Sequence, residues 1–335
     1  MNLAEFSADV LPKIEIELQR VINGLGNDPY NALHGMLAYH LGWEGEGAGE
    51  KAQGKRIRPL LVLLSTMAAG RDWQKALPAA AAVELIHNFS LIHDDIEDRS
   101  EFRHGRKTIW AIWGEPQAIN TGDCMFSLAF EAIVQSVNSP QNVISAVDLL
   151  QKTCVEVTKG QYLDMSYEKE DDLPLDAYWK MVGGKTAALL ACSAAIGATL
   201  TGAEKGIIKT LYDFAWNLGL AFQAQDDWLG IWGDSALTGK STESDLMNGK
   251  KSLPVILGLS ASKDFSNRWN NRPFSTEDLR ILTDILVQSG VQQKVEKEAT
   301  RLTGLAKIGL NSLSVQDDSI NVLLELSDKL INRNK

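Results

Sequence analysis

The chain of 335 residues has few cysteines and no concentrated positive charge, and both shortages limit its possible functions. Cys124, Cys154 and Cys192 lie far apart without a CxxC pair, which excludes the common zinc and dithiol motifs and predicts buried thiols in a reducing compartment. The formal net charge is −10 and no lysine-arginine stripe is present, so we expect no nucleic-acid binding. The composition indicates a globular protein, and the free thiols lead us to expect it in the cytoplasm.

The sequence also lacks the motifs of several enzyme and binding classes. GxSxG and HExxH are absent, and an EF-hand loop starting at Asp94 would have Arg99 where the sharp turn needs glycine. Gly233–Thr242 resembles a phosphate-binding P-loop, but five residues separate its glycines where the motif has four. The sequence therefore does not predict a serine hydrolase with GxSxG, a zinc peptidase with HExxH, an EF-hand calcium sensor or a P-loop nucleotide-binding protein.

Long apolar runs are scarce. Met1–Leu25 has acids early and no continuous apolar core, so it predicts an amphipathic first helix rather than a signal peptide. Thr186–Ala203 is uncharged and about as long as a minimal membrane span, but it consists mainly of small residues and has no flanking aromatic belt. We predict a helix buried at the centre of the protein, and no transmembrane segment.

Strand patterns are scarce as well, with no Asn-Gly or Asp-Gly hairpin between alternating segments. Helical periodicity is strong in Arg58–Gly70, Lys75–Asp95 and Leu211–Asp234. The polar breaks between such segments contain no long linker with a change in composition. The sequence therefore predicts an all-α fold with one domain over residues 1–335.

Acidic residues are concentrated directly after the apolar run Leu85–Ile92. Asp94 and Asp98 are four residues apart, so on a helix their carboxylates share a face, with Asp95 beside them. Oxygen ligands without a closed cage suit Mg²⁺, which shares its coordination shell with water and substrate phosphates. The alternative is a solvated helix end.

A second acidic pair, Asp226 and Asp227, follows the apolar run Leu218–Phe222, and Gly230 stands at the next helical position. If the two acidic groups face each other across a helical bundle, they form a carboxylate cage open to a polyphosphate. Basic residues occur beside these groups and in two glycine-rich loops, where they would neutralise diphosphate. They are Lys55, Arg56, Arg58, Arg103, His104, Lys185, Lys240, Lys250 and Lys251.

Taken together, these motifs resemble a trans-type isoprenyl diphosphate synthase of the polyprenyl synthetase family. The resemblance covers Gly54–Pro254. In order along the chain, it rests on GKRIRP from Gly54, ELIHNFSLIHDDIED from Glu84, RHGRKT from Arg103, GD at Gly122, GQYLD from Gly160, KTAAL from Lys185, FQAQDDWLGIWGD from Phe222 and TGKSTESDLMNGKKSLP from Thr238.

The resemblance implies an isoprenoid synthase fold, a helical bundle around a central cavity, in a homodimer. It implies ionisation of an allylic diphosphate, attack by the alkene of isopentenyl diphosphate, and loss of a proton to the released diphosphate. Three Mg²⁺ ions would bind the allylic diphosphate through Asp94, Asp95, Asp98, Asp226 and Asp227, with Arg103, Lys185 and Lys240 assisting. Lys55, Arg58 and His87 would bind isopentenyl diphosphate, Thr186 and Gln223 would line the position of the cation, and Lys250 would be a further diphosphate-binding cation.

Two positions depart from the family pattern. The family usually has Arg-Arg-Gly where this chain has Arg103, His104 and Gly105, so one cation becomes a group only partly charged at neutral pH. The last acid of the second motif is Gly230, which puts one metal contact in question.

The resemblance also bears on the product. Phe89, five residues before the first aspartate, is an aromatic of the kind found in enzymes that make geranylgeranyl diphosphate (C20). Farnesyl diphosphate (C15) is the near alternative. A terpene cyclase or other prenyl-modifying enzyme on the same fold is a rival suggested by His104 and Gly230. A non-catalytic partner subunit is disfavoured because Asp94, Asp95 and Asp98 are all present.

Overall fold

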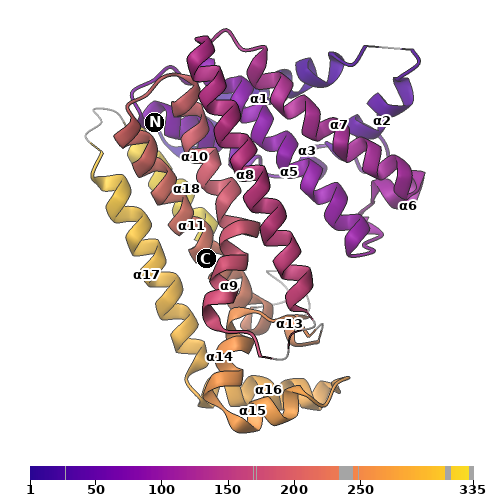
Figure 1. Cartoon of the computed structure of the whole chain (residues 1–335), viewed down its shortest axis with the longest axis vertical. Coiled ribbons are helices and arrows are strands. Elements are labelled where there is room, and N and C mark those ends of the chain that lie inside the picture. The colour runs from indigo at the N-terminus through magenta and orange to yellow at the C-terminus, as the bar shows by residue number, and fades with distance from the viewer. Residues whose placement is uncertain are drawn as a thin grey trace. The chain divides into compact units, whose positions relative to one another are not determined.

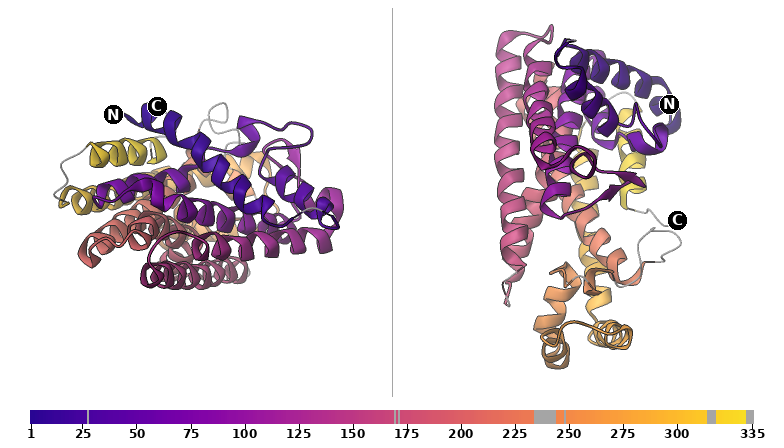
Figure 2. Two further views of the ribbon diagram at one scale, coloured as in Figure 1. Left: turned by 90° about the horizontal axis from the view of Figure 1, so that it is seen from above. Right: turned by 90° about the vertical axis from the view of Figure 1, so that its right-hand side faces the viewer.

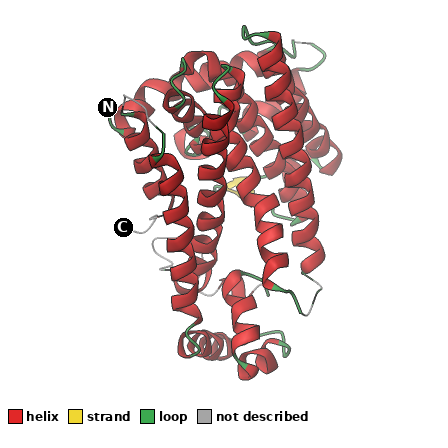
Figure 3. Cartoon of the chain, turned by 60° about the vertical axis from the view of Figure 1, so that its left-hand side comes forward, coloured by secondary structure: helices red, strands yellow, loops and turns green. Residues whose placement is uncertain are grey.

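The protein is described by a computed structural model that covers residues 1–26, 28–168, 170, 172–233, 244–247, 249–313 and 318–331. The described chain is almost entirely helical, with one short hairpin (Figure 3). The all-α prediction is confirmed. The elements are α1 (Leu3–Asn23), α2 (Asn31–His40), α3 (Glu50–Gln53), α4 (Ile57–Ala68), η1 (Trp73–Ala76), α5 (Leu77–Glu97), β1 (Phe102–Arg103), β2 (Arg106–Lys107), α6 (Ile109–Trp113), α7 (Glu115–Val134), α8 (Pro140–Tyr167), α9 (Leu175–Val182), η2 (Gly183–Ala187), α10 (Ala188–Leu200), α11 (Lys205–Trp232), α13 (Ser244–Met247), α14 (Leu253–Ala261), α15 (Lys263–Trp269), α16 (Thr276–Gln288), α17 (Val291–Asn311) and α18 (Ser319–Ile331).

Local signals explain where several helices begin and end. At the start of α1 the Asn2 side chain accepts a hydrogen bond from the Glu5 backbone N–H, and the Glu5 carboxylate accepts one from the Asn2 N–H. Pro78 lies in the first turn of α5, where its missing N–H costs no helical hydrogen bond. Gly70 follows α4 with φ of +68°, a conformation that glycine adopts without strain.

Within the described residues, the chain divides into two compact units, and each is described by itself. Unit 1 comprises Met1–Cys154, Cys192–Lys209 and Val315–Leu323. Unit 2 comprises Val155–Ala191, Thr210–Ser314 and Leu324–Lys335. The chain passes from one unit to the other inside α8, α10, α11 and α18. The expectation of one domain over residues 1–335 stays a prediction.

Unit 1 has a core built around α5, which packs along α7 and against α1 and α4. Figure 1 labels α1, α5 and α7, and Figure 2 shows the chain from two further sides. The small residues of α10 are needed for close packing. A Cβ atom on Gly197 would lie 2.2 Å from Thr66 Oγ1 and 2.8 Å from Val62 Cγ1. Because α10 approaches α4 so closely, large side chains do not fit there.

Unit 2 has its own apolar core, to which α14, α15, α16 and α17 contribute. Trp269 and Phe265 are fully buried and stack with their ring centroids 5.8 Å apart. Leu246 of the short helix α13 is fully buried and belongs to the same core. This core therefore holds α13, which is important for the site described below.

One segment, Leu175–Leu200, is long and apolar enough to cross a membrane, and 89% of its most apolar window is buried within the structure. Such burial is typical of a core helix, as the small side chains of Thr186–Ala203 predicted. All three cysteines are free. Burial raises the pKa of Cys154 and of Cys192 to about 12. Cys124 differs from the prediction of buried thiols because it is only half-buried.

Candidate active site

The first acidic group lies at the end of α5 in unit 1. The Asp98 backbone N–H donates to the Asp94 carbonyl at 2.8 Å, so the helical spacing predicted for these two residues continues through Asp98. Asp94 is half-buried and Asp98 is exposed. Asp95 is only 3% exposed, and both its oxygens accept from Arg103 Nε, at 2.9 and 3.1 Å. Asp95 therefore anchors Arg103 beside the other two acids.

Arg103 is held in place by a hairpin that the sequence analysis missed. Phe102 pairs with Lys107 and Arg103 pairs with Arg106. His104 and Gly105 form the two-residue connection, with φ of +51° and +76°. Positive φ at both residues is the geometry of a type I′ turn, which suits a glycine at the second position. The His-Gly pair is the local signal for this turn, but it is not one of the Asn-Gly or Asp-Gly pairs that most strongly indicate a hairpin.

His104 is exposed at this turn, whereas Arg103 points to Asp95. Histidine is one of the few side chains other than glycine that is enriched in the left-handed region. The departure from the Arg-Arg-Gly pattern thus falls at a position that favours a residue able to adopt positive φ.

The residues predicted to bind isopentenyl diphosphate also lie in unit 1. Lys55 is exposed, and Arg58 and His87 are half-buried. Burial is the main cause that lowers the pKa of His87 well below its ordinary value, and the charge of Arg58 lowers it further. His87 is therefore neutral near pH 7 in the ligand-free protein. His40 behaves in the same way, since burial and then Arg103 lower its pKa to about 3.

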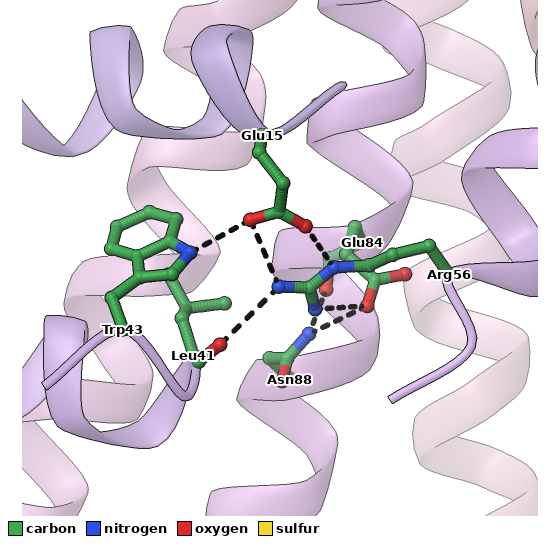
Figure 4. A network of polar contacts seen from close by, with 6 residues as sticks. All are labelled: Glu15, Leu41, Trp43, Arg56, Glu84 and Asn88. Atoms are coloured by element: carbon green, nitrogen blue, oxygen red, sulfur yellow. Dashed lines mark hydrogen bonds and ion pairs between the residues drawn. The ribbon is translucent and has the colours of Figure 1, made fainter. Parts of the chain in front are cut away.

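Between Lys55 and Arg58 stands Arg56, which has a different role from its neighbours. Arg56 is 4% exposed, and its guanidinium is enclosed by the polar network shown in Figure 4. Its Nε donates to Glu15 Oε1 at 2.6 Å, and its Nη1 donates to Glu84 Oε1 at 2.8 Å. Glu15 belongs to α1 and Glu84 to α5, so one buried arginine ties the loop to two helices of the core.

Other groups complete this network. Trp43 Nε1 donates to Glu15 Oε2 at 2.7 Å, and Asn88 Nδ2 donates to Glu84 Oε1 at 3.2 Å. Arg56 Nη2 also donates to the Leu41 carbonyl at 3.3 Å. Arg56 itself has φ of +46°, an uncommon conformation for a side chain of this size. The sequence showed the arginine but gave no sign of its two distant carboxylate partners.

Phe89 lies on α5 and contacts aromatic side chains of α5 and α7. Its ring centroid is 5.1 Å from that of Phe126 and 4.7 Å from the imidazole of His93. Phe126 in turn contacts Phe130 at 5.1 Å. Gly122 leaves space for His93, because a Cβ atom at Gly122 would lie 2.4 Å from His93 Nε2. These contacts form an aromatic row in unit 1.

The second acidic pair lies near the end of α11 in unit 2. Asp226 is half-buried, and Asp227 is 1% exposed. Asp227 Oδ2 accepts from the Tyr178 hydroxyl at 2.7 Å and from the Leu253 N–H at 2.8 Å, and its Oδ1 accepts from Gln223 Nε2 at 2.9 Å. Burial, reinforced by Asp227, raises the pKa of Tyr178 well above its usual value, so its hydroxyl stays a donor. No pattern in the sequence indicated that Tyr178 would be a partner of Asp227.

Lys185 and Thr186 lie in η2, a single π-helical turn between α9 and α10. Lys185 forms a short ion pair with Asp164 of α8, and Thr186 Oγ1 donates to Gln223 Oε1 at 2.9 Å. The amide of Gln223 thus links Thr186 to Asp227. Turns of this kind occur often at functional sites because they redirect side chains within a helix.

Glycines allow neighbouring helices to approach this turn. A Cβ atom on Gly160 of α8 would lie 2.0 Å from the Lys185 backbone nitrogen, and one on Gly219 of α11 would lie 2.6 Å from Ala187 Cα. Neither distance is possible for a real side chain. Backbone packing on two sides therefore determines where Lys185 and Thr186 lie.

Two predicted lysines follow α11 in the sequence. Lys240 lies outside the described residues. Lys250 Nζ lies 3.5 Å from Asp227 Oδ1 and 3.8 Å from Asp245 Oδ2. Desolvation lowers the pKa of Lys250, but the carboxylates of Asp227 and Asp245 outweigh it and raise the pKa above its ordinary value. Lys250 is thus a charged neighbour of the second acidic pair.

The two acidic groups belong to different units, so their predicted meeting across a bundle stays a prediction. Among the residues that the structure describes, no three His, Cys, Asp or Glu side chains form a ready-made metal site. The acids do supply oxygen ligands in pairs, with Lys250 ammonium already placed between two carboxylates of unit 2. That donor set fits Mg²⁺, which needs only one or two protein carboxylates when phosphate oxygens and water complete its shell.

Residues 49–284 match the family described as polyprenyl synthetase. The chain is 38% identical over 298 residues to a (2E,6E)-farnesyl diphosphate synthase of Mycobacterium tuberculosis strain H37Rv, which covers 84% of this chain and 82% of that protein. It is 38% identical over 283 residues to a geranylgeranyl pyrophosphate synthase of Geoglobus acetivorans, covering 84% and 88%. The structure of a polyprenyl synthase from Caulobacter crescentus CB15, complexed with calcium and isoprenyl diphosphate, aligns with a TM-score of 0.83 at 29% identity, covering 99% of this chain and 97% of that one.

Proposed function

The chain belongs to the polyprenyl synthetase family and is a short-chain trans-prenyltransferase with the isoprenoid synthase fold, and from this premise we propose that it condenses isopentenyl diphosphate with an allylic diphosphate to form geranylgeranyl diphosphate. The observation that carries the proposal is the combination of two carboxylate pairs with separate sets of cations. Relatives named farnesyl and geranylgeranyl synthases at equal identity support both C15 and C20 products.

In the proposed reaction, the ions that accompany the allylic diphosphate would be held by two groups of carboxylates, Asp94, Asp95 and Asp98 in unit 1 and Asp226 and Asp227 in unit 2. When bound, magnesium neutralises the departing diphosphate. The calcium and isoprenyl diphosphate in the Caulobacter structure support a divalent cation and this substrate class. Two of these acids also have protein partners, since the oxygens of Asp95 accept from Arg103 and those of Asp227 accept from Tyr178. In the proposed site these two acids therefore orient their neighbours as well as offering oxygens to the metal, and the number of three ions stays a prediction.

Fixed cations assist the same diphosphate. Arg103 is held by Asp95, and Lys185 is held by Asp164, so both side chains are oriented before substrate binds. Orientation in advance stabilises developing charge without a reorganisation cost during the reaction. Lys240 and Lys250 would add charge from the segment after α11.

Isopentenyl diphosphate would bind through Lys55, Arg58 and His87. The Arg56 network supports this assignment because it holds the backbone on which Lys55 and Arg58 lie. Thr186 and Gln223 would line the position of the carbocation, and their mutual hydrogen bond supports this proposal because it orients both side chains. The released diphosphate would accept the proton, so no side-chain base is required.

Phe89 supports a C20 product, because its contact with Phe126 places a bulky aromatic pair on α5 and α7. An aromatic barrier near the first acidic group would limit how far a growing apolar chain extends. We further propose a cytoplasmic homodimer without a transmembrane segment, on the support of the family resemblance and the buried Leu175–Leu200 segment. Light scattering of the purified chain measures the oligomeric state.

The decisive measurement is product analysis with dimethylallyl, geranyl and farnesyl diphosphates as primers, each with isopentenyl diphosphate and Mg²⁺. After phosphatase treatment we expect a C20 alcohol from every primer. Asp94→Asn should lower kcat at least about 100-fold because a metal carboxylate is lost. Glu101→Gln, at an exposed acid near the same helix end, is the matched control and should retain activity.

Other outcomes assign the alternatives. A C15 alcohol that is never extended would make the chain a farnesyl diphosphate synthase. A hydrocarbon or alcohol formed without isopentenyl diphosphate would indicate a cyclase. No elongation with any primer would overturn the proposed function.

A further inference from the structure

Gly230 stands where the second acidic motif of the family pattern has an acid, and another carboxylate occupies the space beside it. An ideal Cβ atom built on Gly230 would lie 2.5 Å from Asp245 Oδ2, 2.6 Å from Asp245 Cγ and 2.9 Å from Asp245 Oδ1. The Asp245 carboxylate therefore lies where a side chain at position 230 would begin. We infer that Asp245 supplies the third carboxylate of the second metal-binding motif.

The positions along α11 support this inference. Gly230 is four residues after Asp226, so an acid at position 230 would share a helix face with Asp226. The carboxylate of Asp245 reaches the same face from α13, a separate segment of the chain. A side chain at position 230 would require the Asp245 carboxylate to move from its present place, which gives the glycine a physical reason.

The fold holds Asp245 at this place. The Lys250 backbone N–H donates to the Asp245 carbonyl at 2.9 Å, and the Gly249 N–H donates to the Leu246 carbonyl at 3.0 Å. The adjacent Leu246 is fully buried in the core of unit 2. Asp245 is thus anchored by its backbone and by its neighbour, although α13 has only four residues.

A cation already lies between the acids concerned. Lys250 Nζ is 3.5 Å from Asp227 Oδ1 and 3.8 Å from Asp245 Oδ2, longer than an ordinary hydrogen bond of about 2.7–3.2 Å. Its side chain is 43% exposed, so it has room to move away. The ammonium therefore acts as a stand-in for the charge of a divalent cation. The expected ligand is Mg²⁺ bound together with a diphosphate, whose oxygens complete the coordination.

This inference rests on the proposed function for the identity of the diphosphate, but it can be tested without turnover. The probe is Mn²⁺ binding to the full-length chain in the presence of inorganic diphosphate, followed by electron paramagnetic resonance. We expect Asp245→Asn to weaken one class of Mn²⁺ sites about tenfold or more. Asp264→Asn, at an exposed acid of α15 in the same unit, is the control and should bind as the unaltered chain does.

A reciprocal exchange of the two residues separates a metal-binding role from a structural one. Gly230→Asp alone should weaken binding because its side chain collides with Asp245. Asp245→Gly alone should also weaken it. The double variant Gly230→Asp with Asp245→Gly restores both the space and the carboxylate, so its Mn²⁺ affinity should return to within about threefold of the original, roughly 0.7 kcal/mol.

Unchanged Mn²⁺ affinity in Asp245→Asn would overturn the inference, and so would a double variant that binds no better than Asp245→Gly. Thermal unfolding of each variant shows whether it is folded, and Asp245→Asn, which adds no bulk, decides the question if Gly230→Asp does not fold. If the unaltered chain binds Mn²⁺ and diphosphate as expected but elongates no primer, the proposed function fails while the assignment of Asp245 stands.

Discussion

Single residues account for the two departures from the family pattern, and in both the backbone or the packing supplies the reason. His104 occupies a left-handed position in a tight turn, and Gly230 leaves room for the carboxylate of Asp245. In each case, another residue of the same site supplies the charge that the departure takes away. Arg103 keeps its ion pair with Asp95, and in the assignment inferred above Asp245 provides the second motif with its third carboxylate. The two departures therefore do not favour a cyclase over a chain-elongating enzyme.

Arg56 gives a test of positioning at the scale of one side chain. Arg56→Lys keeps the charge but cannot reach Glu15 and Glu84 at once, so the loop that carries Lys55 and Arg58 should shift. We expect KM for isopentenyl diphosphate to rise about tenfold or more, with a smaller change in KM for the allylic substrate. Steady-state kinetics with each substrate varied in turn measures the difference.

The matched control is Arg20→Lys, because Arg20 forms an exposed ion pair with Glu17 on α1 and should tolerate the exchange. Arg56→Ala should be far less stable than Arg56→Lys, since it leaves two carboxylates without their partner, a loss of about 3–5 kcal/mol. Equal increases in both KM values for Arg56→Lys would show a general defect and contradict the positioning role.

The burial of His40 predicts how the stability of the protein depends on pH. Its pKa is about 3 in the folded chain and about 6.5 when unfolded, so the unfolded state binds a proton first as the pH falls. Stability should therefore fall below pH 6.5, by up to about 1.4 kcal/mol per pH unit from this group, until the pH approaches the folded pKa. Arg103, Arg56, Arg106 and His104 are the charged or titratable groups that act on it.

Urea unfolding between pH 7 and pH 5 checks this expectation. His40→Asn should reduce the pH dependence of the free energy of unfolding, and His34→Asn, at a half-buried histidine of the same helix α2, is the control variant. His87, which burial also keeps neutral, should continue to contribute in both variants. An identical pH dependence in His40→Asn and the original chain would contradict the assignment.

Among the elements, the π-helical turn η2 depends most on its neighbours. Gly160→Ala would place a methyl group 2.0 Å from the Lys185 nitrogen, so the turn must move away from α8. Because Lys185 and Thr186 both lie on this turn, we expect kcat to fall about 100-fold. Gly304→Ala, on α17 with no atom near its Cβ position, is the control and should be neutral or stabilise the protein by up to about 1 kcal/mol.

A fall in kcat for Gly160→Ala together with a large loss of folded protein would indicate a folding defect instead. Near-ultraviolet circular dichroism of the variant at the assay temperature separates the two results. Unchanged kcat in a folded variant would show that the position of Lys185 is not critical.

Elements were predictable where their cause is local. The helices α4, α5 and α11 were predicted from their periodic apolar residues, and α10 from its small residues. The acidic groups lie near helix ends, as expected. The β1–β2 hairpin was not predicted, because each strand has only two residues and the turn contains histidine. The π-helical turn was not predicted either. It depends on the packing of Gly160 and Gly219 against it, and the sequence of Gly183–Ala187 does not reveal this packing.

For the whole molecule, the fold class and the family could be inferred from motif order, but the partners of the site residues could not. Glu15 and Glu84 reach Arg56 from distant positions in the chain, and Asp245 reaches Gly230 from another segment. Such contacts depend on tertiary packing rather than on spacing. Asp95 shows the same limit, because its neighbours Asp94 and Asp98 gave no indication that it is buried against Arg103.

Metal removal tests the molecule as a whole. Inorganic diphosphate with Mg²⁺ should raise the free energy of unfolding by about 2.7 kcal/mol at 100 times its Kd, because it binds only the folded chain. Addition of EDTA should abolish both this effect and the activity. Differential scanning fluorimetry measures the shift, with sulfate at matched ionic strength as the control. Equal stabilisation by diphosphate with and without metal would contradict the carboxylate assignment.

The unequal burial of the three cysteines offers a site for selective chemical labelling. Cys154 and Cys192 are shielded from water and their high pKa leaves almost no thiolate near pH 7, so maleimide reagents should leave them untouched. Cys124 is the more accessible thiol, and it lies on α7 two residues from Phe126 of the aromatic row. A probe attached there would report on the surroundings of α7, without any engineered cysteine.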